Sequence, residues 1–104
     1  MEFELTAANF DEEVLQNSEP VLVDFFAVWC GPCMMLMPII EDIADSDVGV
    51  CVGRVNIDDD PELTEKYSVM SVPTLILFKD GKPAGRLTGY HSEDEIMNFI
   101  KSCL

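Results

Sequence analysis

The segment VLVDFFAV, residues 21–28, is apolar at every position except Asp24. An apolar run of this length, without the alternation of a half-exposed strand, predicts a β-strand that is covered on both faces. Such a strand needs helices on both sides of its sheet, so the run predicts a layered α/β protein. Asp24 is the exception. Burying a carboxylate costs free energy, so packing alone does not explain why an aspartate stands in this strand.

Strands and helices alternate along the rest of the chain. The other expected strands are residues 2–5, 50–57, 74–79 and 83–88. The expected helices are residues 9–16, 32–45 and 60–67, and a last one that begins near Ser92. The Asp-Gly-Lys turn at residues 80–82 predicts a hairpin, so the last two strands should be antiparallel neighbours. The whole series predicts a mixed sheet with helices on both faces.

Three helix starts have capping signals. Asn9 with Glu12 and Ser92 with Glu95 have the spacing of a capping box. Asp60 followed by Pro61 is typical of an N-cap and a first helical position.

The composition limits the classes of function. With 104 residues and 48% hydrophobic residues, the chain is expected to form a single domain over residues 1–104. A net charge of −14 and a pI near 4.1 disfavour binding to nucleic acid or to an anionic membrane, so we expect other proteins as partners. The N-terminal sequence has no features of a signal peptide, which predicts a cytoplasmic protein. In that reducing compartment, reactive or buried thiols are more plausible than a structural disulfide framework.

The sequence WCGPC places Cys30 just after the expected central strand and Cys33 at the start of the following helix. The free N–H groups and positive dipole end of that helix favour the thiolate form of Cys30. Cys33 falls on the apolar face of the helix, so we expect an exposed, reactive Cys30 and a shielded Cys33. A disulfide across two intervening residues closes a small ring that adds little stability, which favours redox chemistry over a structural role.

Several segments together resemble the thioredoxin family. They are VDFFA at residues 23–27, WCGPC at 29–33, RVNIDDDPELTEKY at 54–67, SVPTLILFKDGK at 71–82 and TGY at 88–90. The similarity extends over essentially the whole chain. It implies the thioredoxin fold, an α/β architecture with a five-stranded mixed central sheet flanked by four helices, and reduction of protein disulfides.

The resemblance also implies roles for individual residues. Cys30 would attack the substrate, Cys33 would resolve the mixed disulfide, Asp24 would be the buried acid and Pro73 a cis-proline facing the cysteines. Burial raises the pKa of Asp24, which would let it exchange a proton with Cys33 near neutral pH. We expect an apolar substrate groove formed by Trp29, Gly31, Pro32, Val72, Gly89 and Tyr90, with Pro73 beside it.

The implied partners are proteins. Thioredoxin reductase would supply electrons from NADPH, and ribonucleotide reductase, peroxiredoxin or methionine sulfoxide reductase could receive them. We expect a monomer with no bound cofactor and no metal, since the redox-active Cys30–Cys33 disulfide carries the electrons. Cys51, Cys103 and His91 do not supply the second cysteine pair that a zinc site needs.

Two positions depart from the family pattern. Met34 stands where thioredoxins commonly have a lysine, and is expected either to contact partners or to pack near Trp29. Arg54 stands where a lysine usually lies near the buried acid. Because arginine keeps its proton, the electrostatics around Asp24 should differ.

Two other functions stay open. The chain could be a binding module or holdase of the same fold with incidental thiols. It could also be an oxidant or isomerase, although Gly-Pro between the cysteines supplies no histidine to stabilise the thiolate.

Overall fold

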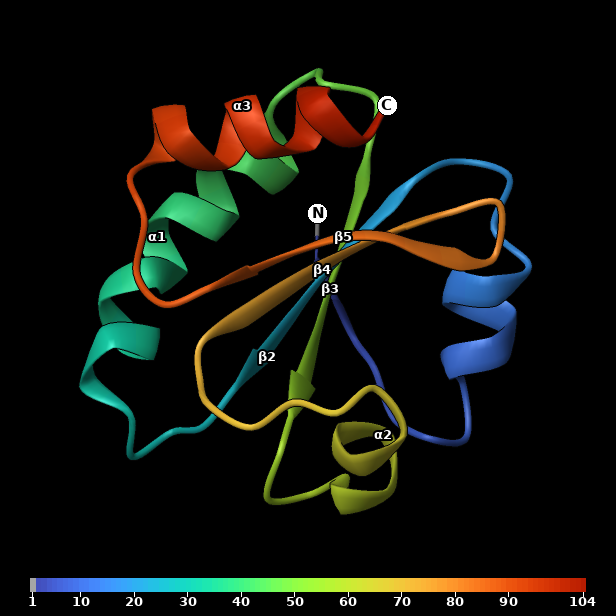
Figure 1. Ribbon diagram of the computed structural model, residues 1–104, viewed down its shortest axis with the longest axis vertical. Coiled ribbons are helices and arrows are strands. Elements are labelled where there is room, and N and C mark those ends of the chain that lie inside the picture. Colours follow the sequence, from blue (N-terminus) through green and yellow to red (C-terminus); the bar gives the residue numbers. More distant parts are fainter. Residues whose placement is uncertain (1) are drawn as a thin grey trace.

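The computed structural model describes residues 2–104, and over that range it has a five-stranded sheet with strand order β1-β3-β2-β4-β5 (Figure 1). The strands are β1 (Glu2–Glu4), β2 (Val21–Phe26), β3 (Cys51–Asn56), β4 (Thr74–Lys79) and β5 (Lys82–Thr88). The helices in this range are a short π-helix η1 (Asp11–Leu15), α1 (Gly31–Asp45), α2 (Pro61–Lys66) and α3 (Glu93–Cys103). β1, β3 and β2 are parallel, and β4 and β5 are antiparallel to their neighbours. The predicted mixed sheet and its helices are therefore confirmed.

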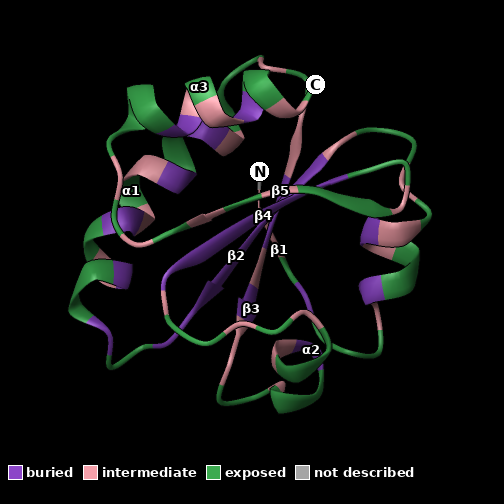
Figure 2. Cartoon of the chain, viewed as in Figure 1, coloured by how far each residue is buried: buried purple, intermediate pink, exposed green. Residues whose placement is uncertain are grey.

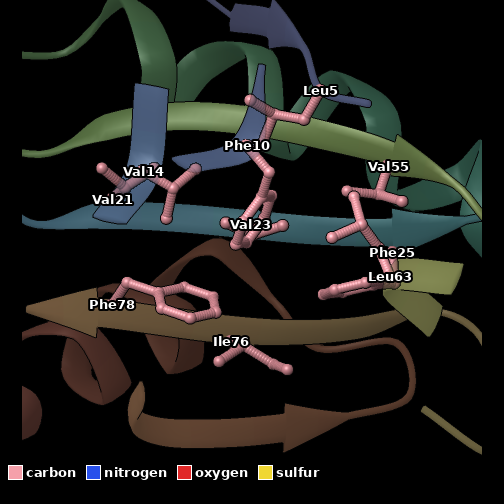
Figure 3. Close-up of a cluster of buried hydrophobic side chains, with 10 residues drawn as sticks. All are labelled: Leu5, Phe10, Val14, Val21, Val23, Phe25, Val55, Leu63, Ile76 and Phe78. Atoms are coloured by element: carbon pink, nitrogen blue, oxygen red, sulfur yellow. The ribbon is translucent and has the colours of Figure 1, made fainter. Parts of the chain in front are cut away.

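β2 lies in the centre of the sheet and is buried at all of its positions (Figure 2). On one face, η1 and α2 contribute to a cluster that Figure 3 shows, made of Leu5, Phe10, Val14, Val21, Val23, Phe25, Val55, Leu63, Ile76 and Phe78. On the other face, α1 and α3 contribute to a cluster made of Leu22, Leu36, Ile40, Ile43, Val52, Leu75, Leu77, Ile96 and Ile100. Alternate residues of β2 enter opposite clusters, which explains why the strand is apolar on both faces.

The β4–β5 hairpin forms as expected. Asp80 and Gly81 at its turn both have positive φ, 53° and 79°. Two successive positive φ values are typical of a type I′ turn, whose twist matches that of the flanking strands, and Gly81 adopts this conformation at little cost.

Of the three predicted N-caps, those at Ser92 and Asp60 are confirmed in position, and only Ser92 makes the expected side-chain hydrogen bonds. Ser92 Oγ accepts from the Glu95 N–H at 3.2 Å, and Glu95 Oε1 accepts from the Ser92 N–H at 3.0 Å. Asn9 instead accepts from the Thr6 N–H at 2.8 Å, and η1 begins after Phe10 as a π-helix. Asp60 is the N-cap residue of α2 and Pro61 its first helical residue, as predicted, but the Asp60 carboxylate accepts from the Ala7 N–H at 3.0 Å and makes no capping hydrogen bond to the helix. The Asn9 box was therefore wrong, and the Asp60 side chain does not bond to its helix, because in each case a backbone N–H outside the helix is the donor instead.

None of the helices within residues 2–104 has the length and apolar composition needed to cross a membrane.

Candidate active site

The cysteine pair lies where β2 leads into α1 (Figure 1). Cys30 is the N-cap of α1, and it forms a disulfide with Cys33, with 5.2 Å between the two Cα atoms. The Cys33 N–H donates to Cys30 Sγ at 3.2 Å. Once the disulfide is reduced, this amide and the helix dipole stabilise negative charge on the Cys30 sulfur. The pair can therefore alternate between a disulfide and a dithiol whose first sulfur is a nucleophile.

Cys33 is shielded as expected, but Cys30 is more buried than the sequence suggested. Cys30 is 6% exposed and Cys33 1% exposed, so the expectation of an exposed Cys30 was wrong in degree. Phe26 and Ala27 form a buried cluster with the two cysteines. A substrate sulfur must therefore approach through the small opening at Cys30.

A second loop, 42 residues further along the chain, contacts the disulfide. Cys30 Sγ lies 3.7 Å from the Val72 carbonyl oxygen, and Val72 packs against the cysteine cluster. The Val72–Pro73 peptide bond is cis, as the resemblance implied, and Pro73 is buried. The Gly89 N–H donates to the Pro73 carbonyl oxygen at 2.8 Å, which joins the end of β5 to this loop. The chain thus brings Cys30, Val72, Pro73 and Gly89 together from three separate segments.

The remaining expected groove residues are accessible. Trp29 is 68% exposed, and its Nε1 donates to Asp58 Oδ2 at 2.8 Å, which restrains the indole ring. Gly31 and Pro32 are exposed at the first turn of α1. Tyr90 is 43% exposed, and within the described part of the chain no hydrogen bond or ring contact links it to the cysteines. Tyr90 therefore remains the least supported member of the predicted groove.

Asp24 is buried in the middle of β2, with 1% of its surface exposed. Burial raises its pKa to about 7, although the Arg54 guanidinium acts in the opposite direction. Asp24 lies between Leu22 and Phe26 on the side of the strand that faces α1, because Leu22 packs with α1 and Phe26 packs with the cysteines. Its carboxyl group can therefore gain and lose a proton near neutral pH, on the face of the sheet where Cys33 is buried.

Arg54 lies beside Asp24 in the sheet, as the sequence suggested, but its ion pairs are with β1. Its Nε is 3.9 Å from Glu2 Oε1 and its Nη2 is 3.6 Å from Glu4 Oε1. The sequence analysis missed Glu2 as a member of this group. The signal was the alternation of Glu2, Phe3 and Glu4, which places both carboxylates on one face of the first strand.

Three further side chains can be placed in the structure. Met34 is partly buried against the cysteine cluster, whereas Met35 is 64% exposed. Of the two expected roles of Met34, packing is therefore the one that the structure supports. Cys51 is partly buried, and burial raises its pKa. Cys103 is also partly buried, packed against the cluster beneath α3.

Comparison with known proteins places this arrangement in context. A sequence model of the family described as Thioredoxin matches residues 2–102. The chain is 46% identical over 93 residues to a thioredoxin of Alicyclobacillus acidocaldarius, covering 88% of each protein. It is 44% identical over 99 residues to a thioredoxin of Rickettsia bellii, covering 94% of each. It is also 44% identical over 87 residues to a bifunctional thioredoxin reductase/thioredoxin of Mycobacterium leprae, covering 83% of this chain and 19% of that protein.

Proposed function

The chain belongs to the thioredoxin family, whose members are thiol–disulfide oxidoreductases, and on this basis we propose that it reduces protein disulfides in the cytoplasm through Cys30 and Cys33. The observation that carries the proposal is the position of the pair. Cys30 caps α1 and its sulfur accepts the Cys33 N–H, an arrangement that stabilises a thiolate at one end of a reversible disulfide.

The reaction has two exchange steps. The Cys30 thiolate attacks one sulfur of the substrate disulfide, forming a mixed disulfide and releasing the first substrate thiolate. The Cys33 thiol then passes its proton to the Asp24 carboxylate and attacks Cys30 Sγ. This forms the Cys30–Cys33 disulfide and releases the second substrate thiolate. The substrate gains two electrons, and the protein loses two.

The geometry supports roles for the residues around the sulfur atoms. The Val72 carbonyl, 3.7 Å from Cys30 Sγ, lies where an extended substrate segment could add main-chain hydrogen bonds like an extra strand. Pro73 holds this loop against the cysteines, and Gly89, with φ of 91°, leaves room for a substrate backbone. Trp29, Gly31, Pro32 and Tyr90 complete the proposed groove.

The electron donor is proposed to be a thioredoxin reductase. The name of the M. leprae relative joins a reductase and a thioredoxin in one protein, which supports this pairing. Ribonucleotide reductase, peroxiredoxin and methionine sulfoxide reductase are the proposed classes of acceptor, with the protein acting as a monomer and no cofactor bound.

The test is dithiol-dependent reduction of a model protein disulfide, combined with the reduction potential of the Cys30–Cys33 couple. We expect turnover that is lost in Cys30→Ser, and a potential well below the value of about −180 mV that is typical of disulfide isomerases. A binding module with incidental thiols would show no turnover. A potential at or above that of the isomerases would assign the chain to oxidation or isomerisation instead.

A further inference from the structure

One guanidinium lies among several carboxyl groups beneath α1. In the sheet, Arg54 of β3 is opposite Glu4 of β1 on one side and opposite Asp24 of β2 on the other. Paired residues of adjacent strands point to the same face, so all three side chains lie on the face that α1 covers. Glu2 precedes Glu4 by two positions and shares that face. The edge strand thus brings two carboxylates to the group that includes the buried acid.

Within residues 2–104, the charged groups of Arg54, Glu2 and Asp24 lie close together without a hydrogen bond between them. Arg54 lies 3.9 Å from Glu2 and 3.6 Å from Glu4, and the side chains of Arg54, Glu2 and Glu4 are 17%, 15% and 75% exposed. Among the described residues, Asp24 Oδ1, Glu2 Oε1 and Arg54 Nε and Nη1 are buried and have no hydrogen-bond partner. Charge interactions are strong at such desolvated positions. Asp24 and Glu2 therefore compete for the charge of a single guanidinium.

α1 adds further negative charge from above. Burial raises the pKa of Glu2, Arg54 opposes this change, and Glu41 and Asp45 of α1 add to it. Glu2 in turn raises the pKa of Asp24, as burial does, whereas Arg54 lowers it. Two effects of Glu2 therefore act together: its negative charge repels an Asp24 carboxylate, and its ion pair with Arg54 occupies the cation that would stabilise that carboxylate.

We propose that Glu2 is a positioning residue for proton exchange at Asp24, because it holds the Arg54 guanidinium toward β1 and so keeps the Asp24 carboxyl able to accept and release a proton near neutral pH. The inference rests on the proposed role of Asp24 as the acceptor of the Cys33 proton. Without Glu2, Arg54 would stabilise the Asp24 carboxylate more strongly, because its remaining partner, Glu4, is exposed and screened by water. Asp24 would then stay ionised to lower pH and would be a weaker base for Cys33.

The experiment follows the titration of the Asp24 carboxyl carbon by NMR in the oxidised protein, which requires no catalysis. In the unmodified protein we expect a midpoint at about 7. In Glu2→Gln the midpoint should fall by roughly half to one pH unit, since one nearby negative charge is removed. Glu4→Gln is the matched control: Glu4 also pairs with Arg54, but it is 75% exposed and water screens its charge, so the midpoint should hardly move.

A second variant and a second measurement keep the test decisive. Glu2→Ala also removes the charge, and should lower the midpoint even if the glutamine variant folds poorly. The pH dependence of mixed-disulfide resolution, measured in a single turnover, should move down with the carboxyl titration. An unchanged carboxyl midpoint in both Glu2 variants, or an equal change in Glu4→Gln, would overturn the inference. A changed midpoint with an unchanged rate profile would instead overturn the catalytic role proposed for Asp24.

Discussion

Asp24 links the stability of the protein to pH. Burial raises its pKa from an ordinary value of 3.8 to about 7, so between these values the folded chain holds a proton that the unfolded chain has released. Its contribution to stability is therefore fully present below the unfolded pKa and is lost as the pH rises through the folded pKa.

Replacing Asp24 by asparagine should remove this dependence. Asp24→Asn should be more stable than the unmodified protein above pH 7 by a few kcal/mol, at roughly 1.4 kcal/mol for each unit of pKa shift. The difference should become small near pH 4 and vanish only below the unfolded pKa of 3.8, where the aspartate is protonated in both states. Urea unfolding across this pH range measures it, and a difference that is the same at pH 4 and pH 8 would contradict the account.

The same substitution should slow one chemical step. The first attack by Cys30 does not use Asp24, so its rate should change little in Asp24→Asn. Resolution of the mixed disulfide should slow by about tenfold to a hundredfold, the low end of what a general base contributes, because water can replace part of its role. Single-turnover kinetics separates the two steps, and an unchanged resolution rate would leave Asp24 with a structural role only.

Tyr90 tests the predicted groove. It is 43% exposed and lies two residues beyond the end of β5, next to Gly89, whose N–H donates to the Pro73 carbonyl oxygen. Tyr90→Ala should weaken the reduction of a protein disulfide by several-fold, as expected when one aromatic contact is lost, and should barely change the reduction of a small disulfide. Comparing kcat/KM for the two substrates gives the result. Equal losses would remove Tyr90 from the groove.

The N-termini of the helices show how far local sequence determines local structure. The Ser92–Glu95 box forms because both of its partners lie within four residues, and no loop competes for them. Asn9 and Asp60 have similar residue types but bond to Thr6 and Ala7, and Asp60 reaches its donor across 53 positions of sequence. The Asp60–Pro61 signal still marks the start of α2 correctly, so local sequence can place a helix start even where it does not determine which backbone group the capping side chain bonds to.

The capping box of α3 should have a measurable effect on stability. Ser92→Ala removes the acceptor for the Glu95 N–H and should cost about 1 kcal/mol of the free energy of unfolding. Ser102→Ala is a control near the other end of the same helix. Its hydroxyl donates to the Phe99 carbonyl and lies 3.9 Å from Cys103 Sγ at the exposed end of α3, so its effect should be within about 0.5 kcal/mol. Equal effects of the two changes would mean that the cap does not stabilise α3.

For the molecule as a whole, the fold was more predictable than the details of the site. The apolar run of β2 indicates a sheet covered by helices on both faces, and the turn at Asp80 and Gly81 indicates that β4 and β5 are antiparallel. Both signals are short stretches of neighbouring residues, so they can be read from the sequence. The burial of Cys30 was not predictable, since it depends on a contact with Val72 that is 42 positions away. The pairing of Arg54 with Glu2 likewise depends on β1 lying beside β3, a long-range pairing that local periodicity does not encode.

The central claim is that Cys30 attacks and Cys33 resolves. The most direct test reacts a model protein disulfide with two variants, Cys33→Ser and Cys30→Ser, each with Cys51 and Cys103 replaced by alanine so that one thiol remains. Mass spectrometry then measures the mixed disulfide on that thiol. We predict that Cys33→Ser accumulates a stable adduct on Cys30, because the resolving thiol is missing, and that Cys30→Ser forms almost none, because Cys33 is 1% exposed. No adduct in Cys33→Ser, or equal adducts in both variants, would contradict the account.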